Sequence, residues 1–235
     1  MNIQEIAEDL QNARLFARPI ATLKENLDLN SAQEILKEGI NLRKLRGEEL
    51  TGFVLQKENY FSYLTNQMNL IPGSNFSLKD CISPKVSAHL VYYIDSAIRE
   101  NSTIEQIMEA TSSIGMAILV SDSRYEKGQI VSIQEQMADN FFSSYYFLGR
   151  KRLDIKEMKE RPVRAAFYFN NEKKFEKEIL NLTFGLLLLK NIKDLVLQPS
   201  SILLSPNLFD FNPLSSNMDI SLVADYFGAT TFKVI

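Results

Sequence analysis

The hydrophobic period of the chain changes near residue 50, and this change limits the folds that the sequence can adopt. Before it, Ile3, Ile6, Ala7 and Leu10 recur at the spacing of one helical face. After it come short segments rich in Val, Ile, Leu, Phe and Tyr and bounded by turn-forming residues, which is typical of strands. These segments are GFVLQ, KVSAHLVYYID, MAILV, SSYYFLG, VRAAFYFN and SILLS. A helical start followed by a mostly β body predicts an α+β fold.

Three more helices are predicted beyond the first. Two of them begin with S-x-x-E capping boxes, one formed by Ser31 and Glu34 and the other by Ser102 and Glu105. The helix that starts at Ser31 should end where Gly47 follows its last turn. The last helix is predicted from an apolar stripe at helical spacing, made of Phe175, Ile179, Leu182 and Leu186.

We predict a single domain over residues 1–235. With 45% hydrophobic residues the chain can bury one substantial core, and neither an internal repeat nor a Pro/Gly/Ser-rich linker divides it. Residues 1–50 would form a helical N-terminal subregion, and residues 51–235 a β-rich body with inserted helices.

Charge and hydropathy argue against nucleic acid and membranes as partners. The net charge of -3 and the pI of about 5.4 give no overall positive field for phosphate groups or anionic lipid. The start, MNIQEIAEDL, carries acidic residues where a signal peptide would be basic. The apolar run Leu186–Leu189 is far shorter than the ~20 residues of a membrane span. The sequence therefore predicts a cytoplasmic protein.

The chain has one cysteine, Cys81, and one histidine, His89, which is too few for a disulfide framework or a structural zinc site. Ser87 and His89 lie two residues apart in a predicted strand, so their side chains share a face. A serine hydrolase would need an acid to orient the ring, and Asp122 and Asp139 are the candidates. The catalytic candidates are therefore His89, Asp122 and Asp139, although such a histidine is more often a hydrogen-bonded structural residue.

Several short motifs in the same order resemble one enzyme family over nearly the whole chain. They are IAEDLQNAR, PIATL, NSAQEI, RGEELTGFVLQ, PKVSAHLVYYID, NSTIEQIMEA, AILVSDSR, MADN and YYFLG. Together they are similar to the 2-oxopent-4-enoate (2-keto-4-pentenoate) hydratases and 4-oxalocrotonate decarboxylases of the fumarylacetoacetate hydrolase superfamily. The resemblance implies a helical N-terminal region packed on a mixed β-roll, assembled into homo-oligomers.

The resemblance also implies a reaction. Enzymes of this family use Mg²⁺ or Mn²⁺ to chelate the carboxylate and 2-oxo oxygens of a small oxo-acid. The metal acts there as a Lewis acid on the enolate that forms when water adds to the dienol. Such hard cations require oxygen ligands, most of them carboxylates.

The positions that would bind this cation are replaced. Where the family has E-x-E, this chain has Ser87, Ala88 and His89. The third glutamate of the family, on the next strand, corresponds to Leu119 in AILVSDSR. These side chains supply no carboxylate charge to offset the dehydration of Mg²⁺. We therefore expect that no metal cofactor is bound.

The positions that would transfer protons are replaced as well. The family lysine of the first body strand corresponds to Val54, and a family acid falls at or near Tyr60. Between Gln56 and Tyr60 the family loop that covers the substrate is about ten residues longer, a difference that surface loops tolerate. Losing one general acid or base typically costs ~10²–10⁴-fold in rate. We therefore expect the parent reaction to be abolished.

Other residues keep the family pattern. Asp122 and Arg124 match in AILVSDSR, and Asp139 and Asn140 match in MADN. The resemblance places them near the pocket, where an arginine can bind a carboxylate through two hydrogen bonds. The ordinary alternatives are a salt bridge and a turn before the next strand. The pocket positions that the resemblance implies are Val54, Tyr60, Ser87, His89, Leu119, Arg124 and Asn140.

Two hypotheses follow. In the first, the protein is a catalytically degenerate member of the family. It would serve as a binding or partner subunit for a small carboxylate or oxo-acid, as a homo-oligomer or with a related subunit. In the second, the same pocket belongs to a metal-independent hydratase, decarboxylase or hydrolase/lyase acting on a small oxo-acid. That enzyme would use His89 with Asp122, Asp139 or Arg124.

Overall fold

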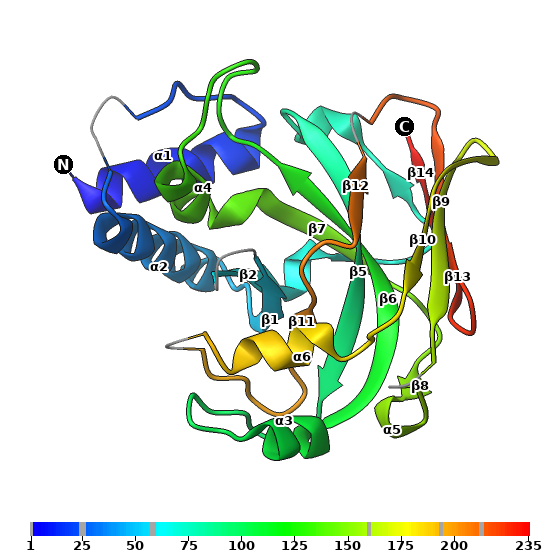
Figure 1. Ribbon diagram of the computed structural model, residues 1–235. Coiled ribbons are helices and arrows are strands. Elements are labelled where there is room, and N and C mark those ends of the chain that lie inside the picture. Colours follow the sequence, from blue (N-terminus) through cyan, green and yellow to red (C-terminus); the bar gives the residue numbers. More distant parts are fainter. Residues whose placement is uncertain (1, 24–26, 57–59, 159–160, 193–194, 212–213) are drawn as a thin grey trace.

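The computed structural model describes residues 2–23, 27–56, 60–158, 161–192, 195–211 and 214–235, and Figure 1 gives the arrangement of its elements. The helices are α1 (Ile3–Phe16), α2 (Leu29–Leu45), α3 (Ile104–Ala110), α4 (Ile133–Ala138), α5 (Ile155–Met158) and α6 (Phe184–Leu189), with short 3-10 helices η2 (Asn66–Met68), η3 (Leu78–Asp80) and η4 (Asn140–Phe142). The strands are β1 (Leu50–Leu55), β2 (Phe61–Thr65), β3 (Asn69–Leu70), β4 (Asn75–Phe76), β5 (Pro84–Ile94), β6 (Thr111–Asp122), β7 (Ser143–Leu148), β8 (Leu153–Asp154), β9 (Val163–Phe169), β10 (Glu172–Ile179), β11 (Ile202–Leu204), β12 (Phe209–Phe211), β13 (Asp219–Ala224) and β14 (Gly228–Val234).

The larger sheet is built around the long antiparallel pair β5 and β6. Within the described residues it has nine strands in the order β2-β1-β11-β5-β6-β7-β3, with β12 also paired to β5 and β8 to β6. β1 and β11 run parallel, as do β3 and β7, whereas β5 and β6 are antiparallel. The sheet is therefore mixed, and β5 and β6 bend strongly along their length (Figure 1).

A second sheet covers one face of the first. In the described part of the chain it has five strands in the order β10-β9-β13-β14-β4. The largest hydrophobic core includes side chains from both sheets, and in it the ring of Phe147 on β7 stacks on Phe232 of β14 at a centroid distance of 4.3 Å. Val86, Ala88 and Leu90 of β5 belong to this same core. One face of β5 is thus fully committed to packing between the sheets.

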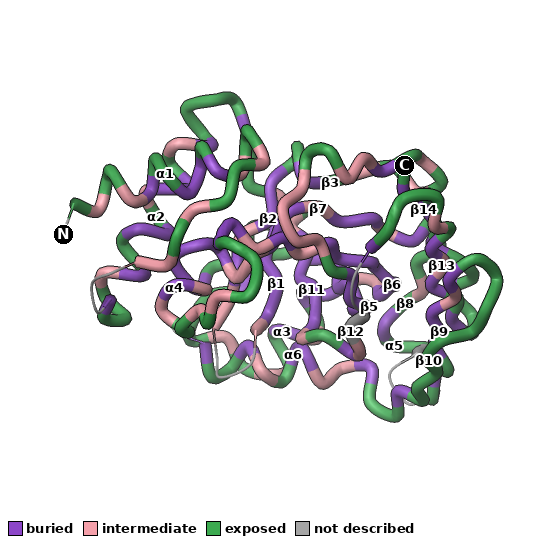
Figure 2. Tube along the Cα trace, turned by 90° about the horizontal axis from the view of Figure 1, so that it is seen from above, coloured by how far each residue is buried: buried purple, intermediate pink, exposed green. Residues whose placement is uncertain are grey.

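The N-terminal helices form a separate layer beside the larger sheet. α1 and α2 pack together with α4, and the five-stranded sheet lies on the opposite side of the molecule (Figure 1). Their shared core contains Leu10, Ile35, Ile40 and Met137, all nearly inaccessible to solvent. Buried residues are concentrated in the strands and on the inner sides of the helices, and the residues of the connecting loops are mostly exposed (Figure 2). The predicted helical region before residue 50 and the mostly β body after it are both present.

Two predicted helix starts are displaced by a few residues. α2 begins earlier than Ser31, because the Asp28 side chain caps it by accepting a hydrogen bond from the Ser31 N–H at 2.8 Å. α3 begins after Thr103, whose hydroxyl and the Gln106 side chain form the capping box. In both helices, the N-cap is a residue close to the predicted one whose side chain can also accept a hydrogen bond from the first turn.

The helix predicted through Phe175 and Ile179 is wrong. Those residues lie on β10, which pairs antiparallel with β9 across a two-residue turn. Asn170 and Asn171 form this turn with φ of 49° and 66°, and asparagine tolerates positive φ better than most residues. β10 is an edge strand whose other side chains are mostly charged, which protects the edge from pairing with another chain. Only α6, which follows, is helical.

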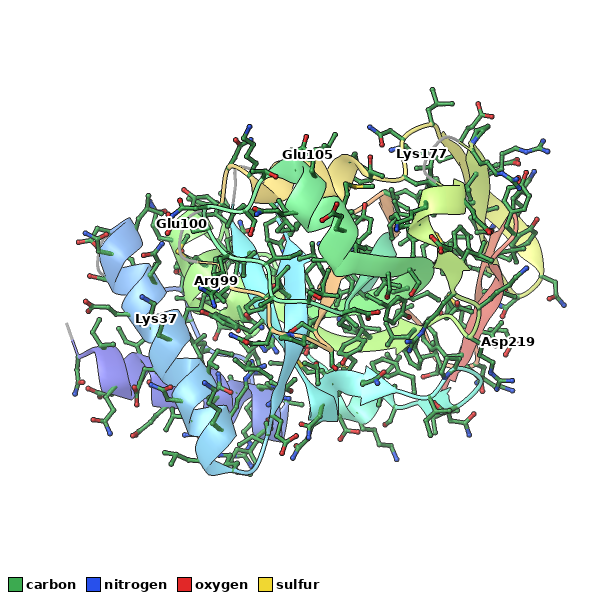
Figure 3. The ribbon with its side chains drawn as sticks, turned by 90° about the horizontal axis from the view of Figure 1, so that it is seen from below. Lys37, Arg99, Glu100, Glu105, Lys177 and Asp219 are labelled. Carbon is green, nitrogen blue, oxygen red and sulfur yellow. The ribbon has the colours of Figure 1, made fainter. Side chains whose placement is uncertain are left out.

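Charged side chains of both signs lie on the outside of the molecule. Lys37, Arg99, Glu100, Glu105, Lys177 and Asp219 are examples from both ends of the structure, and all are exposed (Figure 3). Among the described helices, none combines the length and the apolar character needed to cross a bilayer.

Candidate functional site

Ser87 and His89 lie on the face of β5 that points away from the core between the sheets. Alternate side chains of a strand point to opposite faces, so Lys85, Ser87 and His89 share one face while Val86 and Ala88 occupy the other. On the neighbouring strand β6, Leu119 is the partner of Ser87 in the strand register. These side chains therefore meet at one place on the sheet.

The hydrogen bonds of His89 determine which ring nitrogen carries the proton. Nδ1 lies 2.7 Å from the backbone carbonyl oxygen of Ser205, and Nε2 lies 2.8 Å from Ser87 Oγ. Because a carbonyl oxygen can only accept, a neutral ring must donate from Nδ1 and present Nε2 as the acceptor. The Ser87 hydroxyl then donates a hydrogen bond to Nε2. Ser87 and His89 are both buried, with exposed fractions of 8% and 2%.

Ser205 is fixed in place by β5 itself. Its N–H donates to the Leu90 carbonyl at 2.9 Å, and its hydroxyl accepts from the Leu90 N–H at 3.1 Å. The carbonyl that accepts the His89 hydrogen bond thus belongs to a residue that is itself hydrogen-bonded to Leu90, the neighbour of His89 in the chain. The ring orientation follows from backbone geometry and does not depend on a mobile side chain.

A pocket with a volume of about 310 Å³ opens beside this pair. It is bounded by the ends of β1, β5 and β6, by α4 and η4, and by the segment that follows β11. Besides Ser87 and His89, its polar lining comes from Gln56, Lys85, Ser121, Gln136 and Asn207. Among the described residues that line it, Lys85 is a cation and none is a carboxylate.

The pocket lining includes one of three further predicted pocket positions, which are Leu119, Val54 and Tyr60. Leu119 lines it together with Ser87 and His89. Val54 is fully buried in a core cluster on the same face of the larger sheet and lies outside the described lining. The ring of Tyr60 stacks on Phe141 at a centroid distance of 5.9 Å, and Phe141 lines the pocket. The loop between Gln56 and Tyr60, which we expect to be shorter than in the family, consists of residues 57–59, and these lie outside the described residues.

Arg124 forms a buried cluster with the two candidate acids, away from His89. The guanidinium is fully buried, with Nε 3.5 Å from Asp139 Oδ1 and Nη2 donating to Ser144 Oγ at 2.8 Å. Another guanidinium N–H donates to the Asp122 carbonyl. The Asp122 carboxylate accepts hydrogen bonds from the N–H groups of Ile82 and Ser83. Both acids are therefore engaged with other groups, and the His89 ring is oriented by the Ser205 carbonyl.

Burial dominates the electrostatics of this cluster. It raises the pKa of Asp139 to about 7, although the Arg124 guanidinium opposes the rise. Burial also raises the pKa of Asp122, against the same guanidinium and the two N–H donors. The cluster holds the loop after β6 against α4 and β7.

Asn140 connects η4 to the strand β2. Its side-chain oxygen accepts from the Tyr63 N–H at 2.7 Å, and its amide nitrogen donates to the Tyr63 carbonyl at 2.9 Å. Asn140, Phe141 and Phe142 all have positive φ, between 47° and 63°. A left-handed turn of three residues without glycine costs roughly 1–2 kcal/mol per residue. The two bonds to Tyr63 help to hold this turn, and the turn places Phe141 at the pocket.

Sequence reasoning missed several residues of the site. Ser205 lies 116 positions from His89, and no local pattern links them. Gln136, Phe141 and Asn207 come from a helix, a strained turn and a loop that reach the pocket only through the tertiary fold. Lys85 could have been found, because it has the same strand parity as Ser87 and His89.

The described residues do not fit a divalent cation at this pocket. Mg²⁺ and Mn²⁺ need several oxygen ligands with negative charge, and the described lining offers hydroxyl, amide, imidazole and ammonium groups instead. Elsewhere in the described part of the chain, no group of three or more His, Cys, Asp or Glu side chains is placed to bind a metal. That this protein binds no metal stays a prediction.

Comparison with known proteins identifies the fold. No protein-family model matches the sequence, and no curated protein matches it either. The structure is similar to 4-oxalocrotonate decarboxylase from Pseudomonas putida G7 complexed with magnesium and adipate, with a TM-score of 0.89 and 16% identity, covering 99% of this chain and 97% of the other. The same enzyme complexed with calcium and acetate gives a TM-score of 0.87.

A more distant similarity is to fumarylpyruvate hydrolase from Pseudomonas aeruginosa in complex with Mn²⁺ and pyruvate. The TM-score is 0.59 at 9% identity, with 75% of this chain and 78% of the other covered. The expected α+β fold, a helical N-terminal region packed on a mixed β-roll, is therefore confirmed. The structure is also similar to a putative fumarylacetoacetate hydrolase family protein from Yersinia pestis CO92, with a TM-score of 0.58 and 12% identity, covering 80% of this chain and 94% of the other.

Proposed function

We propose that this protein binds a small carboxylate or oxo-acid in the pocket beside Ser87 and His89, without a divalent cation. It would be a relative of the hydratases and decarboxylases that has lost their metal-dependent reaction and acts as a binding or partner subunit. The observation that carries the proposal is the pocket lining, which combines Lys85 with neutral hydrogen-bonding groups and, among the described residues, contains no acid. Such a lining favours an anion over a cation.

The size of the pocket agrees with a small ligand. About 310 Å³ is at the lower end of the range for small-molecule sites, ~300–1,000 Å³. The amide groups of Gln56, Gln136 and Asn207 can donate hydrogen bonds to carboxylate or keto oxygens. The similar structures contain adipate, acetate and pyruvate, which are carboxylates of this size class.

Loss of the metal-dependent reaction is supported by three positions that lie close together on one face of the larger sheet. Ser87 and Leu119 are partners in the strand register, and His89 follows on the same face. In the enzymes that the sequence resembles, these three positions supply carboxylates to the cation. A hydroxyl, an imidazole and an isobutyl group do not balance a charge of two.

Calorimetry with acetate, pyruvate and adipate tests the binding proposal. We expect at least one of them to bind stoichiometrically with an affinity that is the same in EDTA and in Mg²⁺. The absence of binding by all three would contradict the proposal.

A Mn²⁺ titration tests the loss of the metal site. We expect no stoichiometric Mn²⁺ binding by the wild-type protein. The matched control is the triple variant Ser87→Glu, His89→Glu, Leu119→Glu, which restores three carboxylates and should gain Mn²⁺ binding. Tight binding of one Mn²⁺ by the wild-type protein would overturn the proposal.

A further inference from the structure

We propose that Ser87 is a nucleophile activated by His89, and that the pair transfers acyl groups from esters of small carboxylic acids. This activity goes beyond the proposed function and rests on it only for the class of acyl group. The Ser205 carbonyl takes the place of the acid in a serine hydrolase triad, because it holds the His89 ring in the tautomer that accepts the Ser87 proton.

The geometry distinguishes this serine from Ser62, Ser143 and Ser205, which are buried as well. Ser62 and Ser143 are both buried and lie 2.8 Å apart, but each is hydrogen-bonded to a hydroxyl, which is not a base. The Ser205 hydroxyl donates to the Pro206 carbonyl and is used to hold the chain. Ser87 is the described serine whose hydroxyl meets an imidazole nitrogen and also faces the pocket.

Burial and access are both suited to the reaction. His89 is almost inaccessible to solvent, so the proton transferred from Ser87 would move between groups that water reaches poorly. Ser87 lines a pocket large enough for a small ester. Lys85 and Asn207 also line the pocket, and their side-chain N–H groups are the candidate donors to the oxyanion of the tetrahedral intermediate.

The proposed reaction balances without a further reagent. Ser87 Oγ attacks the ester carbonyl while its proton passes to His89 Nε2, and the tetrahedral intermediate collapses to an acyl-serine. The alkoxide leaves with the proton from Nε2 as a free alcohol. Water then attacks the acyl-serine with His89 again as the base, which releases the carboxylic acid and restores the Ser87 hydroxyl.

Covalent labelling with a fluorophosphonate probe tests the proposal. We expect one adduct per chain, located on Ser87 by peptide mass spectrometry, and hydrolysis of p-nitrophenyl acetate that the probe abolishes. His89→Gln should slow both labelling and hydrolysis by about 100-fold or more, as loss of a general base does. The control is Ser96→Ala at an exposed serine outside the pocket, which should behave as the wild type.

An independent experiment measures the activation itself. In the variant Ser87→Cys, in a Cys81→Ala background, the rate of iodoacetamide alkylation against pH should report a thiol pKa below ~7.5, since a histidine neighbour depresses it. Adding His89→Gln should raise that pKa to about 8.5 or above, because an ordinary thiol titrates near this value and burial at position 87 disfavours the thiolate. This measurement needs no knowledge of the natural substrate, and circular dichroism of each variant verifies the fold.

The outcomes separate this inference from the proposed function. An adduct on another residue, no adduct, or an alkylation profile unaffected by His89→Gln would overturn the nucleophile while leaving carboxylate binding intact. Labelling of Ser87 without binding of acetate, pyruvate or adipate would support the nucleophile and contradict the binding proposal.

Discussion

The residues that we expected to keep the family pattern and the pocket residues that we expected to depart from it lie in two different regions of the molecule. Asp122, Arg124 and Asp139 lie in a buried cluster, in which both carboxylates accept hydrogen bonds from backbone N–H groups and Arg124 pairs with Asp139. Ser87 and His89 face the pocket. The expected matches therefore hold the framework, whereas the expected departures Ser87, His89 and Leu119 line the pocket and Val54 lies in the core.

The difference has a physical cause. Removing one partner from a buried charged cluster leaves the other charge uncompensated, which costs several kcal/mol. Side chains on the pocket face of β5 can change without this cost, because the strand is held by its neighbours β6, β11 and β12. The following predictions test this contrast between framework and pocket.

Arg124→Met should have the largest effect. It leaves Asp139 buried without its cation and Ser144 without its donor, so the free energy of unfolding should fall by about 3–5 kcal/mol. Urea denaturation monitored by circular dichroism measures this change. The double variant Arg124→Met, Asp139→Leu should recover part of the loss, and a double variant as unstable as the single one would contradict the ion-pair explanation.

Asn140→Ala should destabilise the protein by about 2–3 kcal/mol. The substitution removes both hydrogen bonds to Tyr63 and leaves an alanine at φ of 51°. Asn140→Gly loses the same bonds but accepts this φ, so it should be less destabilising than Asn140→Ala in the same assay. Equal losses in the two variants would show that the backbone conformation contributes little.

The stability of the protein should depend on pH through Asp139. Burial raises its pKa in the folded state to about 7, above the ordinary value of 3.8, so the folded state binds more protons than the unfolded state between these limits. The free energy of unfolding should therefore fall as pH rises from about 4 to about 7, by at most ~1.4 kcal/mol per pH unit. Thermal melts across this range measure the slope. Asp139→Asn should flatten it, and an unchanged slope would assign the dependence to other groups.

Lys85→Ala should have the smallest effect on stability and a clear effect on binding. The side chain is exposed, so the free energy of unfolding should change by less than about 0.5 kcal/mol. Affinity for a bound carboxylate should fall by about fivefold, as expected for loss of an ion pair worth ~1 kcal/mol. Urea denaturation measures the stability of the variant, and calorimetry measures its affinity for the carboxylate. A loss of stability without a loss of affinity would assign Lys85 to the framework and not to the pocket.

Six of the strands in the described residues were predictable because their signal is local, whereas β13 and β14 of the second sheet were not predicted. The six segments with strand composition all contain strands, since alternation and turn residues are read within a few positions. β10 was predicted as part of a helix because the spacing of Phe175 and Ile179 also fits a helical face. The Asn170–Asn171 turn, which makes β9 and β10 a hairpin, was not predicted.

The site was only partly predictable for the opposite reason. Strand parity placed Ser87 and His89 on one face, and their hydrogen bond follows from it. The partner of the His89 ring is a backbone carbonyl, which every residue possesses, so its position cannot be read from side-chain types. The same holds for Asn140, whose role depends on Tyr63 on a distant strand.

The alternation of side chains along β5 also has a consequence for engineering. Because Val86, Ala88 and Leu90 secure the strand from one side, positions 85, 87 and 89 form a row that can be rewritten as a unit. A library randomised at these three codons, with position 119 as a fourth, would vary ligand chemistry while the scaffold stays constant. The protein is in this respect a natural starting point for installing a designed binding or catalytic function.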